Sequence, residues 1–266
     1  MYGGIEGMEW TFDTVAFSYD KMRPGYVTAL YQTLFEYIPI NELSTVLEVG
    51  IGSGQATLPI LNTGCRLLAV EYGEHFSKLC KEKFKDYPNF SVFTSKFEEV
   101  DLKNEALDLI FSATAFHWIP EEVGYPKVYS MLKSGGVFAR FANHPYGDKG
   151  NPALLEEIHK LYGKYYYKFY NRKQETLKEY SEKQAEQVAF IAAKYGFKDI
   201  HYELFFRTRT FSAIEYCTLL GTYSDHIAID ETIRTKFFLE IEEAINRHGG
   251  EIIIYDTIDL QLARKP

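Results

Sequence analysis

The stretch Val46-Leu47-Glu48-Val49-Gly50-Ile51-Gly52-Ser53-Gly54-Gln55 decides the fold of this chain. Apolar and β-branched residues fill its first half, which predicts a buried strand that ends at the glycines. Residues 55–61 then look like the start of a helix. Glycines at such a turn allow positive φ angles and let a ligand approach the backbone, while free N–H groups at the start of the helix bind the ligand's polar end. The sequence therefore predicts a strand–turn–helix unit that binds a ligand.

The spacing of these glycines differs from that of dinucleotide-binding loops. Such loops use G-x-G-x-x-G, whereas here the third glycine comes one residue early and Gln55 stands in its place. The pattern is E-x-G-x-G-x-G, which lacks the spacing that packs a pyrophosphate on the start of the helix. A nicotinamide-dependent oxidoreductase is therefore kept only as an alternative.

Strand-like and helix-like segments alternate around this stretch up to about residue 145. The further strand-like runs are 66–71, 90–93, 107–112 and 136–141, and the helix-like patterns are 27–38, 74–84 and 125–132. This alternation predicts βαβ units and a parallel sheet that helices cover on both faces.

The pattern changes beyond residue 145. It indicates helices over 152–178, 182–195 and most of 212–247, a sixth strand at 200–209 and a seventh at 251–263. Because Gly249-Gly250 allows a sharp return, we expect the last strand to be antiparallel in an otherwise mostly parallel, seven-stranded α/β sheet. The chain would be a single domain over 1–266 with its core at 40–145. Helical inserts at about 148–180 and 211–248 would cap the carboxyl ends of the strands, where ligands bind in open α/β sheets.

Two further signals follow the second and third strands. Glu71 ends the second strand, 17 residues after Gly54, and a carboxylate there can accept both hydroxyls of a ribose. Tyr72 is placed to pack against an adenine. Ser95-Lys96-Phe97 is placed to border the adenine with a backbone N–H and an aromatic ring, although core packing is the alternative for Phe97.

These residues resemble the class I S-adenosylmethionine-dependent methyltransferases, which have a Rossmann-like fold. The resemblance extends to the branch of trans-aconitate methyltransferase-like and methyltransferase type 11 proteins. The segments that carry it are Phe12 to Tyr26, Ala115-Phe-His-Trp-Ile-Pro120, Leu132-Lys-Ser-Gly-Gly-Val-Phe-Ala, Leu219-Leu-Gly-Thr-Tyr-Ser and His248 to Arg264. Residues 150–180 depart most from the branch, which leaves the methyl acceptor open.

The resemblance implies S-adenosylmethionine as the cofactor. We expect no metal, because the cysteines show no metal-ligand spacing. The glycines would line its methionine part, Glu48 would reach its amino group, and Glu71 would hold the ribose. Arg23 is a candidate for the methionine carboxylate, with a plain surface arginine as the alternative. The expected cofactor-binding residues are Tyr19, Arg23, Glu48, Gly50, Gly52, Gly54, Gln55, Glu71, Tyr72, Ser95, Phe97 and Ala113.

The acceptor side is expected to include His117, which follows the fourth strand and is the candidate general base. A histidine that only orients the loop is the alternative reading. Methyl transfer is an in-line displacement that depends mainly on alignment, and a base is optional when the acceptor is a carboxylate. The candidate substrate-contacting residues are Trp118, Asn143, His144 and Tyr223.

The composition of the chain limits the kinds of partner that we expect it to bind. A net charge of −8 and a pI near 5.5 argue against nucleic acid and anionic membranes as partners, and we expect a small-molecule acceptor. Three widely spaced cysteines and an N-terminus without signal-peptide features favour a cytoplasmic protein. The oligomeric state is left open, and a non-catalytic cofactor-binding protein of the same fold is a second alternative.

A basic stripe suggests what the acceptor could be. Lys160, Lys164, Lys168 and Arg172 recur every four residues in the predicted helix. The simpler interpretation is a solvated face neutralised by Glu156, Glu157 and Glu175. The other is a site for an anion, from which we derive the hypothesis of an acidic or phosphorylated methyl acceptor.

Overall fold

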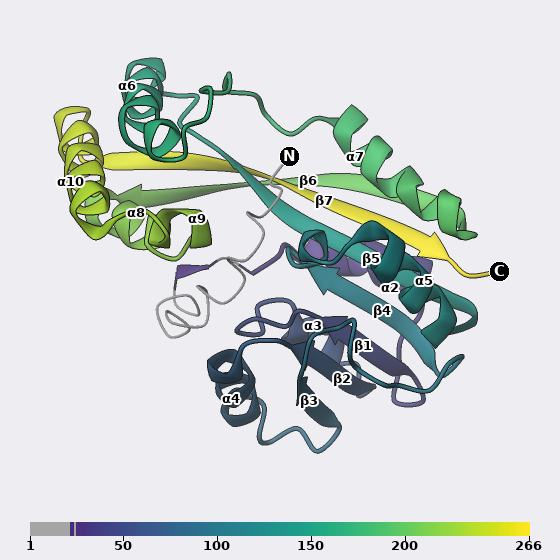
Figure 1. The fold of residues 1–266 in the computed structure, drawn as a ribbon. Helices are drawn as coiled ribbons and strands as arrows, with labels where there is room; N and C mark the ends of the chain where they lie inside the picture. The colour runs from purple at the N-terminus through teal and green to yellow at the C-terminus, as the bar shows by residue number, and fades with distance from the viewer. Residues whose placement is uncertain (1–21, 24) are drawn as a thin grey trace.

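A seven-stranded sheet forms the centre of the protein. A computed structural model describes residues 22, 23 and 25–266 and orders the strands β3-β2-β1-β4-β5-β7-β6 (Figure 1). Strands β1 to β5 are parallel where they pair, and β7 is antiparallel to both of its neighbours. The predicted fold class, including the antiparallel last strand, is confirmed. The strands are β1 (Thr45–Val49), β2 (Arg66–Glu71), β3 (Phe90–Thr94), β4 (Leu107–Ala113), β5 (Leu132–Tyr146), β6 (Lys198–Ser212) and β7 (Glu251–Arg264).

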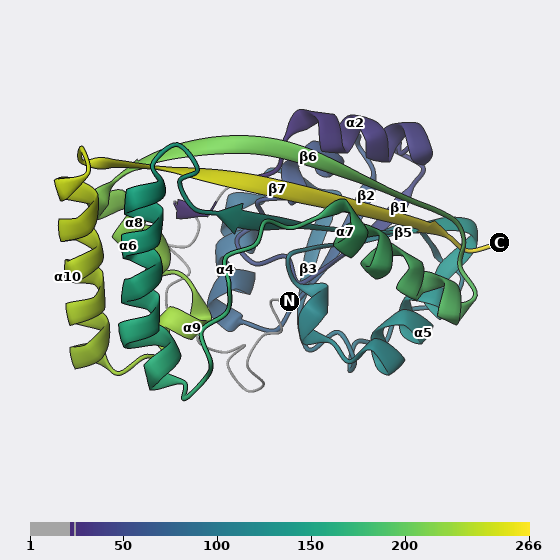
Figure 2. The same cartoon turned by 90° about the horizontal axis from the view of Figure 1, so that it is seen from above.

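Two apolar layers cover the faces of the sheet because neighbouring strand residues point to opposite sides. Val46 faces the layer that holds Leu30 and Leu34, whereas Leu47 faces the layer that holds Val128. Figure 2 shows α2 on one face and α5 with α7 on the other. The covering helices are α2 (Thr28–Tyr37), α3 (Thr57–Leu61), α4 (Glu74–Lys83), α5 (Glu121–Met131) and α7 (Glu182–Ala189).

Four helices form a cap at one end of the long strands. They are α6 (Pro152–Tyr162), α8 (Ala213–Leu220), α9 (Ser224–Ile227) and α10 (Glu231–Arg247). Figure 1 shows them together at the end of β5, β6 and β7 that lies away from the label C. Ile252 and Ile254 of β7 belong to the apolar cluster of this cap, and Ile258 and Leu260 of the same strand belong to the core of the sheet. Strand β7 therefore joins the cap to the sheet.

The helix expected over residues 152–178 is shorter in the structure. α6 ends at Tyr162 and continues as one turn of π-helix over Gly163–Tyr167, and residues 172–181 have no regular structure. The break follows Asn171, whose φ of +48° is a left-handed conformation that stops a helix and that asparagine tolerates. In the part of the chain that the structure describes, none of the helices combines the length and the apolar character needed to cross a membrane.

Candidate functional site

The glycine loop after β1 has the backbone that its sequence predicts. Gly50, Gly52 and Gly54 have φ angles of +72°, +56° and +79°. A Cβ at Gly50 would stand 2.5 Å from the Ala115 Cβ, and one at Gly54 would stand 2.6 Å from the Phe84 ring. Side chains are therefore excluded at Gly50 and Gly54 by both backbone conformation and space.

Helix α4 fastens this loop from behind. The Cys80 thiol donates to the Gly52 carbonyl at 3.1 Å, and the Lys83 ammonium donates to the Ser53 carbonyl at 2.9 Å. The Gln55 amide donates to the Ser53 hydroxyl within the loop itself. These bonds fix the loop before any ligand is bound.

Glu71 connects the ends of β1 and β2. Its Oε2 accepts the Gly52 N–H at 2.8 Å, and its Oε1 accepts the Gly73 N–H at 2.9 Å. A carboxylate has about four acceptor positions, so this group can accept ligand hydroxyls besides the two N–H groups. The acid and the glycine loop form one hydrogen-bonded unit at the carboxyl ends of the two strands.

Glu48 is a buried acid directly beneath the loop, with 1% of its surface exposed. Its Oε2 accepts the Thr57 hydroxyl at 2.7 Å, whereas its Oε1 has no hydrogen-bond partner among the described residues. Burial raises the pKa of Glu48 to about 8, with Glu71 adding to the rise and Thr57 opposing it. A buried carboxyl with one unused acceptor oxygen fits a nearby ammonium group.

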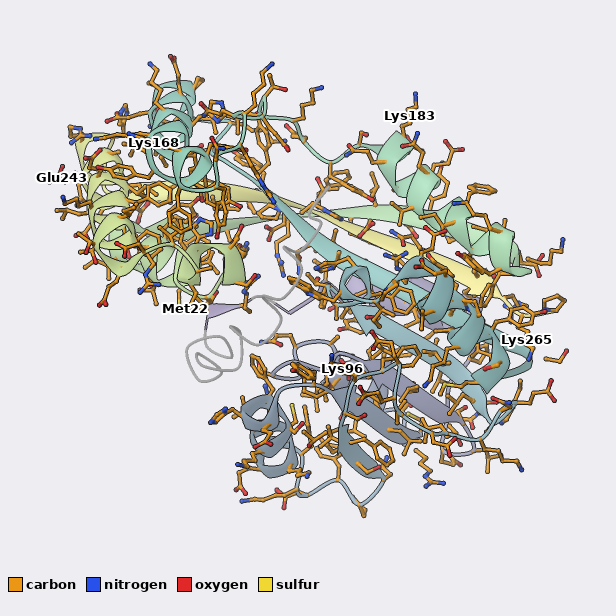
Figure 3. All side chains as sticks on the ribbon, viewed as in Figure 1. Met22, Lys96, Lys168, Lys183, Glu243 and Lys265 are labelled. Carbon is orange, nitrogen blue, oxygen red and sulfur yellow. The ribbon has the colours of Figure 1, made fainter. Side chains whose placement is uncertain are left out.

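The residues after β2 and β3 fit the expected adenine site less well. Tyr72 is 47% exposed, with the Lys96 ammonium 5.4 Å from its ring centre (Lys96 is labelled in Figure 3). The Ser95 N–H donates to the Glu71 carbonyl at 2.9 Å. Phe97 is only 4% exposed and packs in the core against Phe116. The ring of Phe97 therefore takes the packing role, because its burial leaves no open face for an adenine.

A strained turn follows β4 and Ala113. Thr114 has a φ of +54°, a conformation that costs a β-branched residue about 1–3 kcal/mol and that clusters at functional sites. Its N–H donates to the Phe141 carbonyl at 2.8 Å, and its hydroxyl lies 2.7 Å from the Tyr26 hydroxyl. These bonds hold the turn at the end of β4, next to the short helix Phe116–Trp118.

His117 and Trp118 stand on this short helix. His117 is an exposed residue, yet the protein around it desolvates the imidazole. That burial lowers the pKa of His117 to about 4, and Arg140 and His144 contribute in the same direction. The imidazole is therefore neutral at pH 7. Trp118 is half-buried, with its ring 5.1 Å from that of His117.

Asn143 and His144 were expected to border one site, but the structure places them on opposite faces of β5. The side-chain oxygen (Oδ1) of Asn143 accepts an N–H from Arg207 Nη2 at 2.8 Å. His144 stacks on Tyr180 at 3.6 Å on the other face, and its Nε2 lies 3.1 Å from the Asp259 carboxylate. The separation follows from the alternation of side chains along a strand.

Arg23 and Tyr223 meet at the boundary between the sheet and the cap. The Arg23 guanidinium donates to the Thr222 hydroxyl and carbonyl, both at 3.1 Å, and lies 3.9 Å above the Tyr223 ring. Burial raises the pKa of the Tyr223 hydroxyl. Arg23 thus binds the turn between α8 and α9. Tyr19 lies outside the described residues.

Sequence reasoning missed the charged residues of β6 and β7 on the same face as Asn143. Arg207 and Arg209 both bind the buried Asp256 carboxylate, with closest distances of 2.9 and 2.6 Å. The alternation Arg207-Thr-Arg209 was the available signal, since it puts two cations on one side of a strand. Their partner becomes visible only once the register pairs Arg207 with Asp256.

The basic stripe is ion-paired at its first two positions. Lys160 pairs with Glu156 and Lys164 with Glu240, each at 2.6 Å, and both lysines are exposed. Lys168 belongs to the same end of the molecule as Glu243, far from Lys265 (Figure 3). The pairs favour the simpler interpretation of a solvated face, although Glu157 binds Arg247 and His248 instead of the stripe.

The glycine loop lies in a stretch of sequence that matches a known family of protein domains. Residues 47–139 match the family model described as a methyltransferase domain. A relative from Schizosaccharomyces pombe named an uncharacterized methyltransferase is 27% identical, over 85% of this chain and 88% of its own. These matches support a methyltransferase of the class I, S-adenosylmethionine-dependent type. A second S. pombe relative, named methyltransferase-like, is 26% identical to this methyltransferase over 88% of this chain and 85% of its own.

Solved structures share the fold of this methyltransferase. A type II methyltransferase candidate from Anaeromyxobacter dehalogenans superposes with a TM-score of 0.64 at 19% identity, covering 91% of this chain and 97% of the other. Phosphoethanolamine N-methyltransferase 2 from Haemonchus contortus, solved with S-adenosylhomocysteine, superposes with a TM-score of 0.56 at 16% identity. The match covers 96% of this chain and 57% of the other. At these identities the likeness concerns the fold alone.

Proposed function

We propose that this methyltransferase takes its methyl group from S-adenosylmethionine and transfers it to a small molecule that carries an acidic group. The observation that carries the cofactor assignment is the hydrogen-bonded unit of Glu71 and the glycine loop. It presents a carboxylate for ribose hydroxyls beside a backbone whose positive φ angles favour glycine. Gln55 stands where a dinucleotide-binding loop has its third glycine, so the loop departs from the dinucleotide pattern.

The residues present fit this cofactor. Glu71 would accept the ribose hydroxyls, and the loop of Gly50 and Gly52 would pass along the methionine part. The unused Oε1 of Glu48 would receive the methionine ammonium, either directly or through a water molecule. The cofactor supplies a methyl group already activated by the positive charge of its sulfonium.

The remaining work of the protein is alignment. Tyr26 and Thr114 hold the turn after β4, which fixes where His117 and Trp118 stand relative to the glycine loop. His117 is neutral at pH 7 and orients an acceptor by hydrogen bonding; it is a weak base. A carboxylate acceptor needs no base, since it carries no proton to remove. An acidic acceptor therefore suits the site as it stands.

The expected setting of the reaction follows from charge and cysteine chemistry. A net charge of −8 disfavours nucleic acid and anionic membranes as partners. Cys65, Cys80 and Cys217 are free thiols, which suits the reducing cytoplasm. We therefore include a cytoplasmic location and a small-molecule acceptor in the proposal.

Calorimetry tests the cofactor. We expect S-adenosylhomocysteine to bind with measurable heat and NADH to bind with none. Glu71→Gln should weaken S-adenosylhomocysteine about tenfold to a hundredfold, because a charged hydrogen-bond acceptor contributes about 1.5–3 kcal/mol. The exposed Glu74→Gln is the matched control and should bind as the parent does. Absence of heat with folded protein contradicts the proposal.

Turnover tests the acceptor. Release of S-adenosylhomocysteine from S-adenosylmethionine would be measured with a library of carboxylic acids, phosphate esters and neutral analogues. We expect turnover with acidic members only. Cofactor binding without turnover by any member would favour the non-catalytic alternative, and turnover with neutral members alone would contradict the acidic acceptor.

A further inference from the structure

We infer that the acidic group of the methyl acceptor binds the guanidinium group of Arg140, near His117 and the turn after β4. Arg140 lies in β5 and is half-buried. The inference rests on the proposed function, because it names the side chain that recognises the acceptor's acid.

Arg140 is held in place through one end of its guanidinium group. Its Nη1 donates to the hydroxyl of the buried Tyr125 at 2.5 Å. Its guanidinium carbon lies 5.1 Å from the centre of the Phe116 ring and 5.7 Å from that of the Tyr125 ring, where the faces of aromatic rings attract a cation. These contacts orient the guanidinium group but leave it charged.

The other edge of the same guanidinium group is unused. Its Nε is buried and has no hydrogen-bond partner among the described residues, and its Nη2 donates to none of them either. The N–H groups of Nε and Nη2 point the same way and can bind both oxygens of a carboxylate or phosphate. Arg207 and Arg209 use this edge in the same protein, since each donates to Asp256 through Nε and Nη2. The free edge of Arg140 therefore fits an acid.

The part of the chain that the structure describes offers Arg140 no carboxylate as an ion-pair partner. Asp259 is close enough to act, like Arg140, on the Tyr180 hydroxyl, but the acceptor positions of its carboxylate, about four, are already used. Its Oδ1 lies 2.9 Å from the Ala142 N–H nitrogen and 3.1 Å from the His144 Nε2, and its Oδ2 accepts the Tyr180 hydroxyl at 2.9 Å and the Gln261 amide. A buried cationic donor without an acceptor is unfavourable, so an acidic ligand would supply what the protein lacks here.

The position of Arg140 suits an acceptor that meets the methyl group. In the sheet Arg140 pairs with Ser112 of β4, whose hydroxyl donates to the carbonyl of Val49, the residue before Gly50, at 2.8 Å. The turn after β4 touches the glycine loop itself, because a Cβ at Gly50 would stand 2.5 Å from the Ala115 Cβ. Arg140 is therefore level with the start of the loop and two strands away from it, about 10 Å at the usual spacing of strands.

His117 borders the same group. Arg140 and His144 both act electrostatically on its imidazole, and among the described residues the imidazole has no hydrogen-bond partner. A neutral imidazole has one N–H to donate, so His117 can add a hydrogen bond to an acid that Arg140 holds.

A small cavity limits the direction of approach. Arg140, Gln261 and Ala189 of α7 line a cavity of about 10 Å³, which has room for one water molecule at most. An acid cannot enter there. It would instead reach Arg140 through Nη2, which is not among the buried atoms without a partner.

The methionine carboxylate of the cofactor is the other anion to consider, and the strand order argues against it. The methionine ammonium and carboxylate are attached to the same carbon atom, so both stay near Glu48 and the glycine loop at the end of β1. Arg140 is on β5, with β4 between the two strands. The ribose site at Glu71, the glycine loop and Arg140 thus follow one another across the sheet, and Arg140 lies on the side where the acceptor would enter.

The test uses simple anions on the protein saturated with S-adenosylhomocysteine. Malonate and inorganic phosphate are titrated by calorimetry, with neutral malonamide as the reference, and we expect the two anions to bind and malonamide not to bind. Arg140→Met should weaken malonate about tenfold or more, because it removes a charged hydrogen-bond donor, with an S-adenosylhomocysteine affinity close to that of the parent. Arg66→Met is the matched control, since Arg66 is exposed and begins β2 at the opposite end of the strands; its malonate affinity should equal that of the parent.

Each other outcome has a defined meaning. Equal malonate affinity in Arg140→Met and the parent, or no anion binding to the saturated protein, overturns the inference and leaves the cofactor assignment intact. Loss of S-adenosylhomocysteine affinity in folded Arg140→Met assigns Arg140 to the cofactor and also overturns the inference. Failure of the parent protein to bind S-adenosylhomocysteine refutes the proposed function instead.

A second variant covers the case in which Arg140→Met does not fold. Arg140→Lys keeps the positive charge but loses the paired N–H groups of Nε and Nη2. Malonate affinity should then fall about threefold to tenfold, and unchanged affinity in folded Arg140→Lys overturns the inference.

Discussion

The charge of Glu48 depends on what binds beside it. With a pKa near 8 it holds a proton at pH 7, and an ammonium group next to its unused Oε1 would favour the carboxylate form. We therefore predict that S-adenosylhomocysteine binding at pH 7 releases close to one proton. The number is obtained from binding enthalpies in buffers with different heats of ionisation. Glu48→Gln, which cannot titrate, should release none, and equal release by both proteins would contradict the assignment.

The same group makes stability depend on pH. The folded pKa of about 8 lies above the ordinary value of 4.5, so between these values the folded state keeps a proton that the unfolded state has lost. The free energy of unfolding should therefore fall as pH rises from 4.5 to 8. Urea titrations at several pH values would show a flatter dependence for Glu48→Gln than for the parent protein. A parallel dependence in both would exclude a raised pKa at this position.

His117 is predicted to contribute little as a base. Its pKa of about 4 makes the neutral imidazole a weak proton acceptor at pH 7, and loss of an effective general base costs about 10²–10⁴ in rate. We expect His117→Gln to lower kcat less than about tenfold and to leave its pH profile between 5 and 8 unchanged. The control is the exposed His201→Gln. A hundredfold fall in the kcat of His117→Gln would contradict this prediction and support His117 as the general base.

The glycine loop is the element on which the site depends. Gly50→Ala introduces both a strained φ and a Cβ 2.5 Å from Ala115. Gly135→Ala separates the two effects, because Gly135 also has a positive φ, of +80°, but nothing lies within 4 Å of its Cβ position. We expect Gly135→Ala to cost about 1–2 kcal/mol of stability and no affinity. Gly50→Ala should cost more stability and at least tenfold in S-adenosylhomocysteine affinity, measured by thermal unfolding and calorimetry. Equal effects of Gly50→Ala and Gly135→Ala would contradict the close approach of Gly50 to Ala115.

The elements that sequence could predict are those whose cause is local. The strand before Gly50 and the end of the helical segment at Gly196 follow from apolar runs and from glycine's tolerance of positive φ, of +90° at Gly196. The length of the helix predicted over 152–178 was overestimated. The helix breaks where Asn171 takes a left-handed conformation, and the aromatic and basic pattern of this segment does not reveal that conformation.

The part of the site that sequence could not supply depends on register and on strand faces. In the sequence alone, nothing distinguishes Arg207 and Arg209 from other charged residues. Only the pairing of β6 with β7 brings Asp256 beside them. Asn143 and His144 are adjacent in sequence, yet the pleat of β5 sends them to different neighbours.

The molecule as a whole is held together by β7. Leu260 packs in the core of the sheet, and Ile254 of the same strand packs in the cap, both fully buried. We predict that Leu260→Ala and Ile254→Ala, each costing about 2–5 kcal/mol, shift one common unfolding transition. Differential scanning calorimetry would check this. Ile214→Ala, at a 68% exposed position, should change stability by less than about 0.5 kcal/mol. Separate transitions for the two substitutions would show that cap and sheet unfold independently.

The position of β7 also sets the order in which this protein can mature on the ribosome. β7 is synthesised last of the seven strands, yet it lies between β5 and β6. Until it emerges, β5 lacks its neighbour on one side, β6 has no strand to pair with, and the nascent cap lacks Ile252 and Ile254. Unpaired strand edges of this kind are prone to aggregation. Emergence of residues 251–264 from the ribosome is therefore the step that gives β5 and β6 their shared neighbour.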